Sequence, residues 1–267
     1  MDKHIRLAII GDGAIGKYVW EKALESGHIV GALLLRPERL TNRTEVPHGV
    51  VLIDNVSDLP NDIDHVVDCA GHAALASYGP DILRSGVDMT TVSVGALADP
   101  DLFSRLEKAA IEGGAKLHLA SGAIGALDCL RAARVGELQS VTYTGRKPPQ
   151  GWKGSLAESR LDLDNLTNGA AVHYEGSARD AATKYPKNAN VAAAVALAGI
   201  GFDDTRVKLI ADPDVAENIH QIEASGDFGS LSFQIRGHSL PDNPRSSALA
   251  AMSVIAKLAQ ESQSIVF

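Results

Sequence analysis

Cysteine, aromatic residues and long apolar runs are all scarce in this chain of 267 residues. Its two cysteines, Cys69 and Cys129, are too few for a disulfide framework or a cysteine-rich zinc site. No apolar run approaches the ~20 residues of a membrane-spanning helix, and the first residues do not fit a signal peptide. We therefore expect a protein of the reducing cytoplasm, and no cluster of ligands predicts a metal site.

Basic residues are outnumbered by acidic ones, 25 against 33, which gives a formal net charge of −8. This balance argues against nucleic acid or an anionic membrane as a partner, although a local basic pocket would still bind a small anion. Aromatic residues make up only 4% of the chain, whereas apolar residues make up 45%. We expect a globular protein whose core is built from Ala, Val, Ile and Leu.

The organising motif is a glycine turn close to the N-terminus. An apolar run over residues 5–10 enters a G-x-G-x-x-G turn, and a helix-like segment follows over residues 17–26. Gly11 allows the tight turn, Gly13 lets the backbone approach a pyrophosphate, and Gly16 lets helix and strand pack closely. The helix N-terminus directs N–H groups at the phosphates. The motif predicts a dinucleotide site at Gly11, Gly13, Ala14, Ile15 and Gly16; the alternative is a glycine turn without a ligand.

The end of the next apolar run, over residues 28–35, bears on the choice of cofactor. A site that prefers NAD carries Asp or Glu about 20 residues after the glycine turn, to hold the ribose 2′-hydroxyl. This chain has Arg36 and Arg39 there instead. Arg36 can pair with a 2′-phosphate, so we expect NADP to be accepted, alone or beside NAD; the alternative for Arg36 is a solvated loop charge.

Strand-like and helix-like segments alternate as far as residue 120, which predicts a Rossmann-type, doubly wound parallel sheet with helices on both faces. The strand over residues 65–72 ends in Cys69, Ala70 and Gly71, which we expect to line the cofactor near its nicotinamide half. No recognisable His–acid pair activates Cys69, so we interpret it as a small buried side chain. The helix over residues 73–85 contains Pro80, which predicts a kink or break.

The pattern changes after a second small-residue turn, residues 121–126. We expect a hinge there, with the backbone near Ala123 at the nicotinamide end of the cofactor, and an α+β domain with a mixed or antiparallel sheet beyond it. The predicted boundaries are residues 1–121, residues 122–240, and a C-terminal helix over residues 241–267 that packs back on the first domain. The predicted elements of the second domain are strands at 140–146, 205–211, 218–224 and 229–236, and helices at 127–134, 176–185, 189–198 and 244–260.

Such a pair of domains usually holds its substrate in the cleft between them, with the acid–base group on the second domain. His220 lies in mid-strand, and imidazole both takes and gives a proton near neutral pH. Spacing alone favours a packed strand histidine. Four others compete on the same footing: His72, His118, His173 and His238.

Two carboxylates of a substrate would need cationic partners, and several basic residues are predicted to lie in loops. Each of them alone is more often a solvated charge, and Asn190 alone is more often a helix cap or surface amide. The basic candidates are Arg146, Lys147, Lys153, Lys187 and Arg245.

The chain resembles the L-aspartate dehydrogenase family over nearly its whole length. The glycine turn is generic, whereas the stretch from Pro186 to Ala192 and the strand from Asn218 to His220 are far more specific. The other matching segments are Val67 to His72, Ser121 to Gly125, and Gly145 to Pro149.

The resemblance implies a homodimer that oxidises L-aspartate with NAD or NADP to iminoaspartate, which hydrolyses to oxaloacetate and ammonia or serves NAD synthesis. It also implies His220 as the catalytic residue and Ala123 and Asn190 as cofactor contacts. Arg146, Lys147, Lys187 and Asn190 are the substrate-binding candidates. Two alternatives stay open: another two-domain reductase, acting on dihydrodipicolinate or homoserine, and a redox sensor that binds NAD(P) without turnover.

Overall fold

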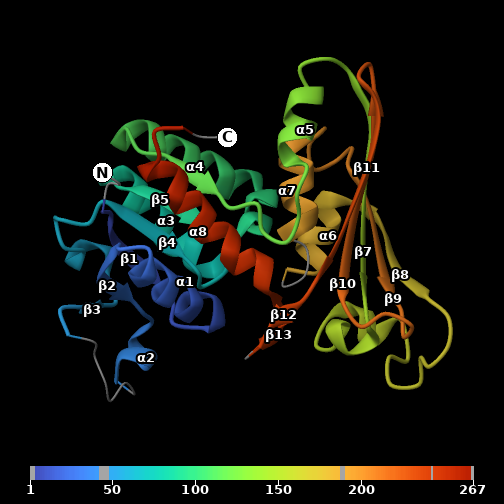
Figure 1. The fold of residues 1–267 in the computed structure, drawn as a ribbon, viewed down its shortest axis with the longest axis horizontal. Coiled ribbons are helices and arrows are strands. Elements are labelled where there is room, and N and C mark those ends of the chain that lie inside the picture. Colours follow the sequence, from blue (N-terminus) through green and yellow to red (C-terminus); the bar gives the residue numbers. More distant parts are fainter. Residues whose placement is uncertain (1–3, 42–47, 187–189, 242, 266–267) are drawn as a thin grey trace. The chain divides into compact units, whose positions relative to one another are not determined.

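A computed structural model describes residues 4–41, 48–186, 190–241 and 243–265 of the chain (Figure 1). The chain forms two compact units. Unit 1 comprises Met1–Ala120 with Ala250–Phe267, and unit 2 comprises Ser121–Leu249. No helix in these described ranges is long and apolar enough to cross a membrane.

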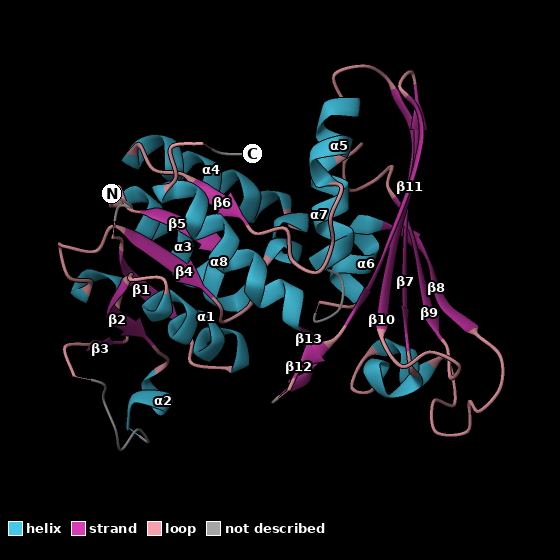
Figure 2. Ribbon diagram, viewed as in Figure 1, coloured by secondary structure: helices cyan, strands magenta, loops and turns pink. Residues whose placement is uncertain are grey.

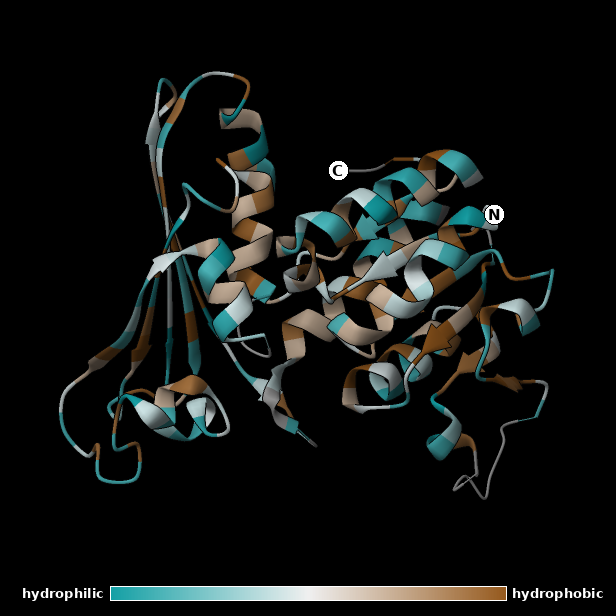
Figure 3. Cartoon of the chain, turned by 180° about the vertical axis from the view of Figure 1, so that it is seen from behind, coloured by the Kyte–Doolittle hydropathy of each residue, from teal (hydrophilic) through white to brown (hydrophobic). Residues whose placement is uncertain are grey.

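Unit 1 is built on a parallel sheet of six strands in the order β3-β2-β1-β4-β5-β6 (Figure 2). The order runs outward from β1 in both directions, which confirms the predicted Rossmann-type sheet and places the topological switch point between β1 and β4. Buried parallel strands need apolar residues on both faces, and β1 and β2 are coloured accordingly in Figure 3. The strands are β1 (Arg6–Ile10), β2 (Ile29–Leu34), β3 (Val51–Ile53), β4 (His65–Asp68), β5 (Asp88–Thr91) and β6 (Leu117–Leu119).

Helices cover this sheet, and the C-terminal helix α8 contributes to the same core. Val254 and Leu258 of α8 are fully buried in one cluster with Leu7 and Ile9 of β1 and Val19 of α1. The helices of unit 1 are α1 (Ala14–Glu25), α2 (Pro37–Thr41), α3 (His72–Arg84), α4 (Pro100–Gly113) and α8 (Ala248–Ser262, in unit 1 from Ala250), with short 3-10 turns at Val56–Asp58 and Val94–Ala98.

Helix α3 runs from His72 to Arg84 with Pro80 inside it, so of the predicted kink or break, the break is wrong and the kink stays a prediction. Proline has no N–H, and the carbonyl four residues before it therefore loses its helical donor. That carbonyl belongs to Ala76, and Arg105 of the neighbouring helix α4 donates a 2.9 Å hydrogen bond to it. A side chain from elsewhere in the fold thus satisfies the group that proline leaves unpaired.

Unit 2 contains a mixed sheet of five strands in the order β11-β10-β7-β9-β8, as the sequence predicted. Strands β7 and β9 are parallel, and the other neighbours are antiparallel. Helix α6 contacts β8 and β9, and helix α7 contacts β7. The strands are β7 (Leu138–Lys147), β8 (Ala171–Ser177), β9 (Arg206–Ala211), β10 (Asn218–Gly226) and β11 (Gly229–Gly237), with a separate pair β12 (Ser239–Leu240) and β13 (Asn243–Ser247). The helices are α5 (Leu127–Ala133), α6 (Ala178–Lys184) and α7 (Asn190–Ala198), with 3-10 turns at Pro149–Trp152 and Leu156–Ser159.

Three local predictions for unit 2 are wrong. Strand β8 was missed because its Glu, Gly and Ser residues have low strand propensity. The last helix begins at Ala248 and not at residue 244, because β13 pairs with β12 first. Arg146 and Lys147 lie at the end of strand β7 rather than in a loop, and Arg245 lies in β13.

Candidate functional site

The glycine turn in unit 1 has the geometry that a diphosphate requires. Gly11 has a φ of +89°, which side-chain-bearing residues rarely adopt. A Cβ at Gly16 would overlap the carbonyl oxygen of Gly11, so this glycine permits the close contact between α1 and β1. At Gly13, by contrast, an added Cβ would meet no atom of the described residues within 4 Å. Gly13 therefore leaves open space where a ligand would approach.

This open space belongs to a pocket of about 350 Å³ beside the carboxyl ends of β1, β2 and β4. In a doubly wound sheet, ligands bind at these strand ends. Gly13 is the N-cap of α1, whose first turn carries no acidic side chain, so the positive end of the helix dipole suits a phosphate. The predicted residues that line the pocket are Gly11, Gly13, Arg36, Cys69 and Ala70, joined by Asp12 and Arg39. The residues present thus fit a dinucleotide.

The other predicted cofactor residues are not among those that line this pocket. Ala14, Ile15 and Gly16 form the first turn of α1, and Gly71 is the N-cap of α3 with a φ of +98°. Ala123 and Asn190 belong to unit 2, where Ala123 is buried and Asn190 begins α7. At the pocket itself, the neighbouring guanidinium of Arg39 lies 3.3 Å from the carboxylate of Asp12.

Asp68 supports the pocket wall, and sequence reasoning missed this role. Its buried carboxylate accepts hydrogen bonds from the Thr91 hydroxyl at 2.7 Å, the Ser93 hydroxyl at 2.6 Å and the Ala70 backbone N–H at 2.9 Å. Burial raises the pKa of Asp68, and these three donors oppose that change. Burial also raises the pKa of the Cys69 thiol well above its usual value, so Cys69 is an inert wall residue.

In unit 2, His220 is the third residue of β10 and is only 4% exposed. Its Nδ1 atom is 2.8 Å from the hydroxyl oxygen of Tyr143 on the neighbouring strand β7. Burial, together with the nearby charge of Lys147, lowers the pKa of His220 to about 3. The imidazole is therefore neutral at physiological pH. Within the described part of the chain, its Nε2 atom has no hydrogen-bond partner.

Lys147 shares the buried face of β7 with Tyr143, because alternate residues of a strand point the same way. It is buried, and its ammonium group lies 5.0 Å from the ring centroid of Trp152. Burial lowers the pKa of Lys147 to about 8. Asn218 and His220 of β10 are also buried and lie on the same face as each other. The sheet thus gathers a basic amine and an imidazole that lie 73 residues apart in the sequence (220 − 147).

The other basic candidates have different surroundings. Arg146 points to the opposite face of β7, where its guanidinium pairs with the buried carboxylate of Asp212. Lys153 pairs with Asp164 at the surface. Lys187 lies outside the described residues.

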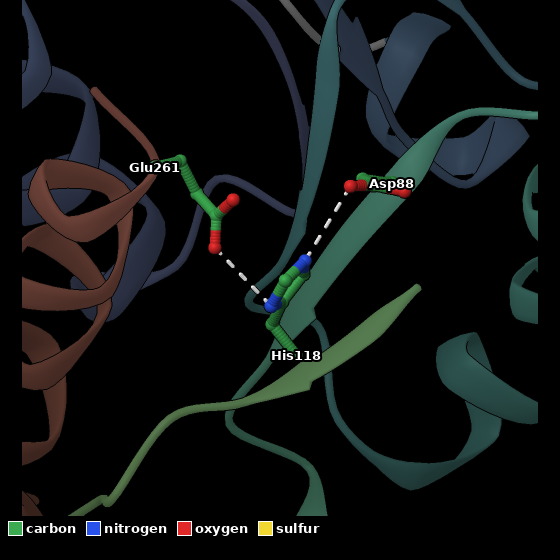
Figure 4. A group of neighbouring side chains, drawn as sticks. All are labelled: Asp88, His118 and Glu261. Carbon is green, nitrogen blue, oxygen red and sulfur yellow. Dashed lines mark hydrogen bonds and ion pairs between the residues drawn. The ribbon is translucent and has the colours of Figure 1, made fainter. Parts of the chain in front are cut away.

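Two of the other histidines considered for the acid–base role, His173 and His118, have well-defined partners. In unit 2, the Nδ1 atom of His173 is 3.0 Å from the hydroxyl of Tyr185, and burial lowers the pKa of His173 to about 4. In unit 1, His118 lies between two carboxylates: Nε2 is 3.5 Å from Asp88 and Nδ1 is 3.2 Å from Glu261 of α8 (Figure 4). The two acids contact different ring nitrogens of His118, and one ligand atom from each of the three residues lies within 4.8 Å of the others. His72 begins α3, and His238 is exposed.

The comparisons with known proteins agree with this architecture. Residues 128–261 match the family model described as "Aspartate dehydrogenase, C-terminal". An L-aspartate dehydrogenase of Ruegeria pomeroyi is 53% identical over 98% of this chain and 94% of its own length. The chain belongs to the aspartate dehydrogenase family. Within this family, the solved structure of the aspartate dehydrogenase from Thermotoga maritima has a TM-score of 0.78 at 29% identity, covering 99% of this chain and 100% of its own.

Two further matches concern the fold. Residues 11–120 match the model described as "Homoserine dehydrogenase, NAD binding domain". A dihydrodipicolinate reductase from Paenisporosarcina has a TM-score of 0.56 at 14% identity, covering 97% of this chain and 95% of its own. At 14% identity this likeness shows a shared fold only. It therefore does not favour dihydrodipicolinate over L-aspartate as the substrate.

Proposed function

We propose that this chain oxidises L-aspartate to iminoaspartate, with NAD or NADP as the hydride acceptor, and that iminoaspartate then hydrolyses to oxaloacetate and ammonia. Family membership and the pocket at the glycine turn support this reaction. The observation that carries the proposal is the imidazole of His220, which is neutral, held through Nδ1 by Tyr143, and without a described partner at Nε2.

The acid–base role follows from the chemistry of amine oxidation. The α-ammonium group of aspartate must lose a proton before hydride leaves Cα, because the nitrogen lone pair forms the new C=N bond. Nε2 of His220 takes that proton. The bound nicotinamide supplies the acceptor for the hydride. Water then adds to the imine carbon, and ammonia leaves after proton transfers in which the same imidazole takes part.

Lys147 is the best candidate for binding a substrate carboxylate, since it lies on the buried face of the sheet with a positive charge at neutral pH. Arg146 already has Asp212 as its partner, which argues for a structural role, and its assignment stays a prediction together with Lys187 and Asn190. For the cofactor, we propose the pocket residues at the glycine turn together with Ala14, Ile15, Gly16, Gly71, Ala123 and Asn190.

We also propose that the chain works as a cytoplasmic homodimer in NAD synthesis or aspartate catabolism. The family resemblance supports the dimer, and the low cysteine content supports a reducing compartment. Light scattering of the purified chain tests the dimer: a mass near twice 28.1 kDa is expected, and the mass of one chain contradicts it.

The decisive experiment measures reduction of NAD and of NADP by absorbance with L-aspartate and with a panel of other amino acids, including homoserine. We expect reduction with L-aspartate and a loss of about 10²–10⁴-fold in kcat for His220→Ala, with cofactor affinity unchanged. His173→Ala is the matched control, because His173 is also a buried histidine that contacts a tyrosine through Nδ1. Full turnover by His220→Ala, or a larger loss for His173→Ala, would refute the assignment, whereas cofactor binding without turnover on any substrate would favour the sensor.

A further inference from the structure

Tyr143 and Gly145 form a paired arrangement next to His220. They are two residues apart on β7 and therefore point to the same face, and Gly145 lies directly opposite His220 in the antiparallel pairing with β10. An added Cβ at Gly145 would lie 2.7 Å from the hydroxyl oxygen of Tyr143 and 3.2 Å from its Cζ atom. The phenol of Tyr143 thus extends over the space that a side chain at Gly145 would fill, and its hydroxyl reaches Nδ1 of His220.

We propose that Tyr143 is a positioning residue for aspartate oxidation, and that Gly145 is a glycine so that the Tyr143 hydroxyl can reach Nδ1 of His220. This inference rests on the proposed function, in which Nε2 of His220 takes the substrate proton.

The hydroxyl suits this role because it both accepts and donates a hydrogen bond. When Nδ1 carries the ring proton, it donates to the Tyr143 oxygen, and Nε2 keeps the lone pair that a base needs. After Nε2 takes a proton, the Nδ1–H group continues to donate to the same oxygen, which stabilises the imidazolium. Tyr143 remains a neutral phenol throughout, since burial raises its pKa.

Strand β8, which β9 separates from β7 in the same sheet, provides an internal comparison. Tyr174 and Gly176 have the same spacing, and an added Cβ at Gly176 would lie 2.6 Å from the Tyr174 hydroxyl. That hydroxyl donates to the backbone carbonyl of Ser177 and not to a histidine. A tyrosine covering a glycine is therefore a packing device that this sheet uses twice, and the contact with a histidine distinguishes the pair on β7.

The test is a double-mutant cycle on kcat with Tyr143→Phe, Gly145→Ala and the double variant. Each single change removes the hydroxyl from Nδ1, so each should lower kcat about tenfold, the equivalent of one neutral hydrogen bond, with little change in KM. When Gly145→Ala is added to the Tyr143→Phe variant, the nearest clashing atom, the hydroxyl oxygen, is already gone. Only the 3.2 Å approaches to Cζ of the ring and to Cδ2 of Leu209 remain, so kcat should change less than about twofold. Equal losses from Gly145→Ala in both backgrounds would overturn the inference.

Gly176→Ala is the matched control for a clash under a tyrosine, and it should leave kcat within about twofold because no histidine depends on Tyr174. If Gly176→Ala lowered kcat as much as Gly145→Ala does, the loss would reflect general disruption of the sheet, and the inference would be overturned. Melting temperatures of all variants identify any that fail to fold.

Nitrogen NMR of histidine-labelled protein gives a readout that is independent of activity, with His220→Gln used to assign the ring signals. Tyr143→Phe should shift the Nδ1 resonance of His220 and leave that of His173 in place; unchanged His220 signals overturn the inference. If His220→Ala loses turnover while Tyr143→Phe retains it, this inference alone fails. If His220→Ala retains turnover, the proposed role of His220 fails, and the inference about Tyr143 fails with it.

Discussion

Lys147 and His220 lie on adjacent strands of one sheet, and burial together with the positive charge of Lys147 lowers the pKa of His220. Burial disfavours the charged form of each group, and the charged forms also disfavour each other because both are cations. An anionic substrate bound beside Lys147 would offset that positive charge. The substrate would thereby raise the pKa of His220 and make it a stronger base at the moment when one is needed.

Replacing Lys147 with Met should raise the pKa of His220 above its value of about 3, because a nearby cation is removed. An NMR titration of the labelled histidines measures this change. Lys153→Met is the control, since Lys153 pairs with Asp164 at the surface and should leave His220 unaffected. An unchanged titration of His220 in Lys147→Met would show that the two groups are not coupled.

The activity should depend on pH through Lys147. Burial lowers the pKa of Lys147 to about 8, so the ammonium group is charged below that pH and loses its charge above it. If Lys147 binds a substrate carboxylate, kcat/KM for L-aspartate should fall as the pH rises through about 8. Arginine keeps its charge at this pH, so in Lys147→Arg the fall of kcat/KM should move to higher pH. If kcat/KM falls at the same pH in both proteins, the fall belongs to the titration of another group.

Replacing two glycines of the turn with alanine should affect two different properties, cofactor binding and stability. Gly13→Ala adds a methyl group to open space, so the melting temperature should hold while the dissociation constant for NADP rises about tenfold or more. Gly16→Ala overlaps the carbonyl of Gly11 and should cost about 1–3 kcal/mol of unfolding free energy. Calorimetry measures the stability and cofactor titration measures the binding. If Gly13→Ala binds NADP normally, the phosphates of the cofactor do not bind at Gly13.

Asp68→Asn should weaken the pocket wall. The amide presents N–H groups where the carboxylate accepts from Thr91, Ser93 and Ala70, so at least one buried donor loses its partner. We expect a loss of about 1–3 kcal/mol in unfolding free energy and weaker cofactor binding. Denaturant unfolding with and without NADP measures both quantities, and unchanged stability would mean that the site adapts to the amide.

Arg36→Ala should affect NADP more than NAD. A charge-assisted hydrogen bond is worth about 1.5–3 kcal/mol, which corresponds to a rise of roughly 10–100-fold in KM for NADP. Arg39→Ala is the control, because Arg39 lines the same pocket but has Asp12 as a partner. Equal effects on both cofactors would indicate that Arg36 does not reach a 2′-phosphate.

Much of unit 1 was predictable from local pattern. Backbone sterics and close packing restrict Gly11 and Gly16 to glycine, and apolar runs of strand length alternate with amphipathic helices. The same local reasoning failed at Pro80, because the group that rescues the helix is Arg105, which belongs to another helix. It also failed at Lys147, where a basic residue beside two prolines suggested a loop although the strand continues into the core.

The sequence by itself determined the glycine turn, the alternation of strands and helices, and the placing of Asn218 and His220 on one face of a strand. These follow from steric limits and side-chain periods that act within a few residues. Only the tertiary structure decided that Tyr143 meets Nδ1 of His220, that Lys147 is buried near it, and that Asp68 supports the pocket wall. Those contacts join residues far apart in the chain, and they depend on strand register and on packing, which no local pattern encodes.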